Sequence, residues 1–111
     1  GHTFGHAIEN TMGYGEWLHG EAVAAGMVMA ASMSKIAESD QARLTALIDT
    51  AGLPVAPPPV GSGQLKAAMR LDKKVQSNRL RFILLRQLGE AYVTSDYGDD
   101  VLDAILAGAD R

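Results

Sequence analysis

The three histidines of the chain are its most chemically versatile side chains, and their spacing suggests a shared site. His2 and His6 are four residues apart, so on a helix they lie on one face, about 6 Å apart. His19 follows Gly13 and Gly15, which allow the chain to fold back toward the first two histidines. Neutral imidazole is a common ligand of Zn²⁺. The spacing predicts a metal site. The alternative is two solvated histidines at the terminus and a third beside a helix N-terminus.

Composition narrows the possible functions. The chain has 111 residues and no cysteine, so disulfides, thiolate metal sites and cysteine nucleophiles are excluded, and any metal must be held by His, Asp, Glu or water. A formal charge of −3, with no basic run longer than Lys73-Lys74, disfavours a nucleic-acid partner. No apolar run approaches the roughly 20 residues that span a bilayer, and the N-terminus has no signal-peptide pattern. We expect one cytoplasmic domain that binds no membrane.

Lys73 and Lys74 form a second candidate site. They follow the expected end of a helix, directly before a strand. Two adjacent ammonium groups can bind a phosphate as point charges. A solvated pair of cations, favoured by the dipole at a helix C-terminus, explains the same residues equally well. The lysines alone leave both possibilities open.

The histidines are expected to lie on helices. Residues 3–12 have the pattern of a short helix, and apolar residues at helical spacing predict a longer, buried helix over residues 21–38. Asp40 is placed to cap a third helix, which ends near Gly52. In this third helix, one shared apolar face is expected to comprise Leu44, Leu47, Ile48 and Ala51.

The second half of the sequence changes character. All four prolines lie in residues 53–61 and predict an extended connection. Ser62 is placed to cap another short helix. Residues 79–86 and 90–95 are rich in Leu, Ile, Phe, Val and Tyr and flank Gln87-Leu88-Gly89, so they predict an antiparallel hairpin. Residues 99–107 predict a last helix. The predicted fold class is therefore mainly α with one small antiparallel β-hairpin.

Three blocks of the sequence resemble the C-terminal domain of 3-dehydroquinate synthase, within the sugar phosphate cyclase superfamily. The blocks are Gly1-His2-Thr3-Phe4-Gly5-His6-Ala7-Ile8-Glu9, then Leu18-His19-Gly20-Glu21-Ala22-Val23-Ala24-Ala25-Gly26-Met27, then Asp72-Lys73-Lys74. They occur in the family's order, and the hairpin and last helix extend the resemblance to Arg111. The resemblance implies that residues 1–111 form the family's helical metal- and substrate-binding C-terminal domain.

The resemblance also implies an activity and a set of site residues. The family is a lyase of the shikimate pathway, dependent on NAD and zinc, that converts 3-deoxy-arabino-heptulosonate 7-phosphate to 3-dehydroquinate and phosphate. By motif, His2 and His19 are similar to the zinc-binding histidines, and His6 to the catalytic histidine that contacts substrate and takes part in proton transfer. Lys73 and Lys74 fall at the family's phosphate-contacting lysine, and the resemblance does not distinguish between them.

Two parts of the family's machinery lie upstream of the matching segment. They are the third zinc ligand, a Glu, and the NAD-binding domain, and none of Glu9, Glu16 and Glu21 occupies that ligand's position. The chain begins inside the first motif without Met, so we expect a fragment whose natural partner is the missing N-terminal domain. Alone, it is expected to be inactive and to bind zinc loosely at most. The intact enzyme is expected to be a homodimer.

Three other interpretations stay open at this point. The chain also fits a related sugar phosphate cyclase of the 2-deoxy-scyllo-inosose or valiolone synthase type. A zinc or iron alcohol dehydrogenase of the glycerol dehydrogenase type is disfavoured by the lysine pair, because an alcohol has no phosphate to bind. The last is a non-catalytic helical interaction module, which should lack the large exposed apolar patch expected of a fragment.

Overall fold

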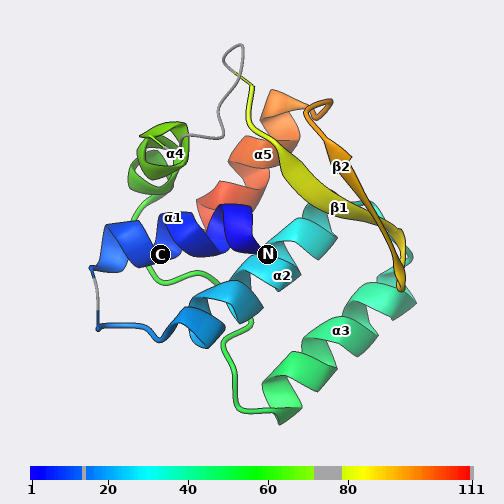
Figure 1. Cartoon of the computed structure of the whole chain (residues 1–111). Coiled ribbons are helices and arrows are strands. Elements are labelled where there is room, and N and C mark those ends of the chain that lie inside the picture. Colours follow the sequence, from blue (N-terminus) through cyan, green and yellow to red (C-terminus); the bar gives the residue numbers. More distant parts are fainter. Residues whose placement is uncertain (14, 72–78, 111) are drawn as a thin grey trace.

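Helix α2 (His19–Met33) lies at the centre of the fold, because it contacts α1, α3, α5 and strand β1 (Figure 1). The computed structural model describes residues 1–13, 15–71 and 79–110. The other elements are α1 (His2–Met12), α3 (Glu38–Thr50), α4 (Ser62–Leu71), β1 (Phe82–Gln87), β2 (Glu90–Thr94), α5 (Asp99–Leu106) and a 3₁₀ turn (Ala107–Ala109). The prediction of a mainly α fold with one antiparallel hairpin is confirmed.

Helices α1 and α2 cross at a point of near backbone-to-backbone contact. A Cβ atom on Gly26 would overlap the carbonyl oxygen of Gly1 and would lie 3.0 Å from the backbone nitrogen of Gly5. A Cβ on Gly5 would in turn lie 3.3 Å from the carbonyl oxygen of Ala22. Only a residue without a side chain allows this approach at Gly26. The crossing holds the first turns of α1 against the middle of α2.

The hairpin is fastened to both of these helices along the outer edge of β1. The hydroxyl of Thr3 on α1 donates to the carbonyl oxygen of Arg81 at 3.0 Å. The backbone N–H of Leu85 donates to the hydroxyl of Ser34, at the end of α2, at 2.9 Å. These bonds satisfy backbone groups at the strand edge that β2 does not pair. They fix the hairpin beside α1, as Figure 1 shows.

The two faces of the hairpin differ in burial. Phe82 and Leu84 of β1 point into the core and are 1% and 4% exposed. Ile83 and Val93, which are cross-strand partners, lie on the outer face and are 58% and 62% exposed. The inner face packs on the main core, which includes Phe4 of α1 at a ring-centroid distance of 5.2 Å from Phe82.

The helix predicted over residues 21–38 ends five residues earlier than expected. α2 begins at His19, which was expected in the preceding loop, and it ends at Met33. The Ser34 hydroxyl donates to the carbonyl oxygen of Ala30 at 2.6 Å, and Lys35 adopts a left-handed conformation with φ 59°. A serine hydroxyl that bonds a helical carbonyl competes with continuation of the helix, and one left-handed residue stops it.

Helix α3 differs from its prediction in both its start and its buried face. It begins at Glu38 with Ala37 as the N-cap residue, so Asp40 lies in the first turn and does not cap the helix. Ile48 packs on Ala24 and Val28 of α2 and is 6% exposed. Leu47, expected on the same buried face, is 69% exposed. Among the described elements, α3 packs mainly on α2, so its buried stripe is narrow.

The cap of α4 also differs from the prediction. Ser62 is the first residue of α4, and its backbone N–H and hydroxyl donate to the carboxylate of Asp110 at 2.6 and 3.0 Å. The capping carboxylate therefore comes from a residue 48 positions away. It ties the end of the chain to α4.

The last helix is confirmed as α5, with its acidic residues Asp99 and Asp100 in the first turn. Within the described residues, no helix is long and apolar enough to cross a membrane.

Candidate functional site

The three histidines meet where the start of α1 approaches the start of α2. Their ring centroids are separated by 5.4 Å between His2 and His6, by 5.3 Å between His2 and His19, and by 6.3 Å between His6 and His19. Phe4 and Ile8 anchor the opposite face of α1 in the core, at 1% and 0% exposure. The helical spacing of His2 and His6, and the return of the chain after α1, therefore produce the cluster that the sequence predicts.

Two of these imidazoles suit a shared zinc ion. With Zn–N bonds of about 2.0–2.1 Å and tetrahedral geometry, two ligating rings have centroids roughly 5 Å apart. The ring pairs His2–His19, at 5.3 Å, and His2–His6, at 5.4 Å, are both close to that separation. Across residues 1–13, 15–71 and 79–110, however, no group of three or more His, Asp or Glu side chains is placed to hold a metal ion. The described residues thus fit part of a zinc site.

Nearby carboxylates have other partners. Glu9 lies one turn beyond His6 on α1, and its Oε1 is 3.1 Å from Nδ1 of His19. Glu21 accepts a hydrogen bond from the backbone N–H of Leu18 at 2.8 Å and so caps α2. Glu16 is exposed. Sequence reasoning weighed Glu9 only as a metal ligand and missed its contact with His19. The available signal was the spacing of His2, His6 and Glu9, which places all three on one helical face.

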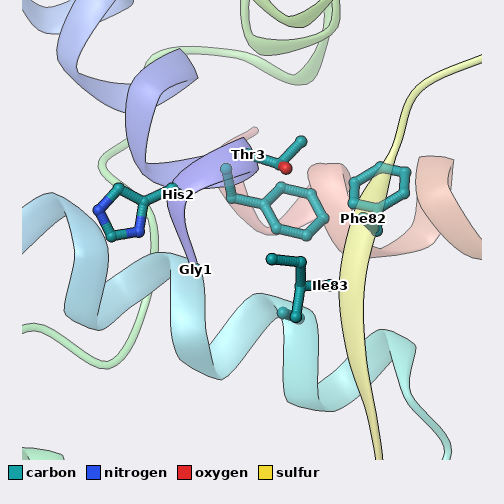
Figure 2. Close-up of a pocket in the computed structure, with 7 residues that line it drawn as sticks. Gly1, His2, Thr3, Phe82 and Ile83 are labelled. Carbon is teal, nitrogen blue, oxygen red and sulfur yellow. The ribbon is translucent and has the colours of Figure 1, made fainter. Parts of the chain in front are cut away.

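A cavity of about 250 Å³ lies on the other side of the first turn of α1. Figure 2 shows the His2 ring directed away from Phe82 and Ile83, which line this cavity with Gly1 and Thr3. His2 also lines the cavity, so it borders both the cavity and the imidazole cluster.

The lysine pair cannot be placed relative to the histidines. Lys73 and Lys74 lie outside the described residues, between the end of α4 at Leu71 and the start of the next described segment at Arg79. Their assignment to a substrate phosphate stays a prediction.

Two solved structures share this fold. One is a 2-epi-5-epi-valiolone synthase from Streptomyces hygroscopicus with NAD⁺ and Zn²⁺ bound, with a TM-score of 0.81 and 25% identity, covering 97% of this chain and 31% of that one. The other is a 2-deoxy-scyllo-inosose synthase complexed with carbaglucose-6-phosphate, NAD⁺ and Co²⁺, with a TM-score of 0.75 and 23% identity, covering 95% and 32%. This chain therefore shares its fold with part of each of these two cyclases.

Sequence comparison is more specific. Residues 1–75 match the family model described as 3-dehydroquinate synthase C-terminal. The chain is 54% identical over 112 residues to the 3-dehydroquinate synthase of Pseudomonas putida, covering 96% of this chain, and 56% identical over 110 residues to that of Neisseria meningitidis, also covering 96%. The chain belongs to the 3-dehydroquinate synthase family. It spans 31% of the length of these two curated relatives.

Proposed function

We propose that this chain is the metal- and substrate-binding part of a 3-dehydroquinate synthase. The observation that carries the proposal is the meeting of three imidazoles at the α1–α2 crossing, within ring-centroid distances of 5.3 to 6.3 Å. Identities of 54% and 56% to synthases of this name support the same activity over a valiolone-forming cyclase, to which the chain is 25% identical. The reaction releases phosphate from 3-deoxy-arabino-heptulosonate 7-phosphate and forms 3-dehydroquinate.

Within this proposal the histidines have separate roles. His2 and His19 would hold zinc, which when bound lowers the pKa of a coordinated hydroxyl and stabilises negative charge on oxygen. His6 lies beside this pair on the same face of α1 and would hold or move a proton of the bound substrate, as neutral imidazole does near pH 7. One of Lys73 and Lys74 would offset the charge of the leaving phosphate.

The remaining parts of the active site would come from outside this chain. The bound NAD⁺ and metal ions of the two cyclase structures support a dependence on NAD and zinc. The chain supplies two metal-binding imidazoles, so a third ligand and the NAD-binding residues would lie in the rest of a longer, homodimeric, cytoplasmic enzyme. By itself, the chain is expected to bind zinc loosely and to release no phosphate.

Zinc titration tests the assignment of the two ligands. We expect calorimetry to show weak zinc binding to the chain. Substitution of either His2→Ala or His19→Ala should reduce the affinity roughly tenfold or more, because each removes one donor atom. His6→Ala is the matched control, since the His6 ring lies 5.4 Å from that of His2 and 6.3 Å from that of His19. It should leave the affinity within about threefold. A loss as large for His6→Ala as for the other two would contradict the division of roles.

A further inference from the structure

The imidazole of His19 is held at one nitrogen by a carboxylate. Oε1 of Glu9 lies 3.1 Å from Nδ1 of His19, within hydrogen-bonding distance. An ionised carboxylate can only accept hydrogen bonds, so this contact places the ring proton on Nδ1. In a neutral His19, the lone pair is then on Nε2.

Of the two side chains in this contact, that of Glu9 is the more buried. The Glu9 side chain is 19% exposed, whereas that of His19 is 57% exposed. Glu9 is in the last full turn of α1, between the buried Ile8 and the start of the connection to α2. Because the carboxylate is partly shielded and carried by a helix, it can hold an exposed ring that would otherwise turn freely.

Three polar side chains on one face of α1 explain why the orientation of the His19 ring matters. His2, His6 and Glu9 are at positions i, i+4 and i+7 of the helix and so share a face. His19 is in contact with both ends of this row of side chains, with Nδ1 on Glu9 and with its ring centroid 5.3 Å from that of His2. With Nδ1 occupied, Nε2 is the nitrogen left to bind a metal that His2 shares.

We propose that Glu9 is a positioning residue that selects the Nδ1-protonated tautomer of His19 and presents Nε2 to the metal. This inference rests on the proposed metal role of His2 and His19. A carboxylate on the second nitrogen of a metal-binding imidazole fixes its tautomer and orientation and raises its basicity. Glu9 thus acts on the metal through His19 and is not a ligand.

Nuclear magnetic resonance of the metal-free chain tests the tautomer directly. The ¹⁵N shifts of the His19 ring at mildly alkaline pH distinguish an Nδ1–H ring from the Nε2–H ring that predominates in unconstrained histidine. We expect Nδ1–H in the wild-type chain and Nε2–H in Glu9→Ala. Glu9→Gln should be intermediate, because its amide oxygen can still accept the proton but carries no charge.

Zinc affinity provides the second measurement. Glu9→Ala should weaken binding by about 10- to 100-fold, and Glu9→Gln should restore part of the loss. Glu21→Gln is the matched control, because the Glu21 carboxylate caps α2 and lies two residues from His19 in the sequence. We expect this variant to keep the wild-type tautomer of His19 and the wild-type zinc affinity. Circular dichroism establishes that each variant is folded.

The two measurements separate this inference from the proposed function. An Nε2–H ring in the wild-type chain, or a tautomer unchanged in a folded Glu9→Ala, overturns the positioning role. An equal effect of Glu21→Gln also overturns it, since the cause would then be general electrostatics. If the wild-type chain shows Nδ1–H but binds no zinc, selection of the tautomer by Glu9 is supported and the metal assignment fails.

Discussion

At the scale of single residues, Gly26 decides how closely α1 and α2 approach. We expect Gly26→Ala to lower the free energy of unfolding by about 1–3 kcal/mol, because the new Cβ would overlap the carbonyl oxygen of Gly1 and force the helices apart. Urea unfolding measures this change. Gly20→Ala is the control in the same helix, since a Cβ there meets no atom within 4 Å. Equal stability of the two variants would rule out the close crossing.

The histidine site was partly predictable from the sequence. His2 and His6 share a helical face because of their spacing alone, and His19 returns to them because Gly13 and Gly15 permit the turn. The contact between Glu9 and His19 could not be predicted in the same way. This contact depends closely on where α2 begins, because His19 is its first residue. Local sequence patterns do not define the start of a helix that closely.

At the scale of elements, Ser34 joins the end of α2 to the hairpin. We expect Ser34→Ala to lower the free energy of unfolding by about 1–2 kcal/mol, because the N–H of Leu85 would lose its acceptor at a half-buried strand edge. Chemical denaturation is the measurement, and hydrogen exchange of the Leu85 amide should accelerate in parallel. Ser39→Ala, on the exposed surface of α3, should change stability by less than about 0.5 kcal/mol. Unchanged protection of the Leu85 amide would contradict the proposed attachment.

Element types were predictable and several of their ends were not. Periodicity identified the helices and the hairpin, because the number and spacing of apolar residues reflect the face that each element buries. The end of α2 depends on Lys35, which adopts φ 59° without being Gly or Asn, the residues that usually mark such a stop. The cap of α4 comes from Asp110, which is distant in sequence. Tertiary contacts of this kind override local signals.

Arg79 is a further case in which tertiary structure determines the role of a side chain. Its guanidinium donates to the carbonyl oxygens of Ser95 and Tyr97 and to the carboxylate of Asp99, and it lies 4.0 Å from the centre of the Tyr97 ring. These contacts tie the start of the hairpin region to the start of α5. A single arginine before a strand carries no sequence signal for them.

At the scale of the whole molecule, the chain corresponds to 31% of the length of its relatives, and the proposed site is similarly partial. In the proposed enzyme, α1 and α2 would provide two metal-binding imidazoles, a positioning carboxylate and a proton-transferring histidine. The sequence predicted this division, because the blocks that resemble the family contain no third metal ligand and no NAD-binding pattern.

The most direct test is to replace the matching segment of the Pseudomonas putida synthase with this chain, which is 54% identical to it. The purified chimera, supplied with NAD and zinc, should release phosphate from 3-deoxy-arabino-heptulosonate 7-phosphate at a rate within about tenfold of the parent enzyme. Its His19→Ala variant should be reduced by at least about 100-fold. A folded chimera that binds NAD and zinc but forms no 3-dehydroquinate would contradict the proposal that this chain provides the metal- and substrate-binding part of such an enzyme.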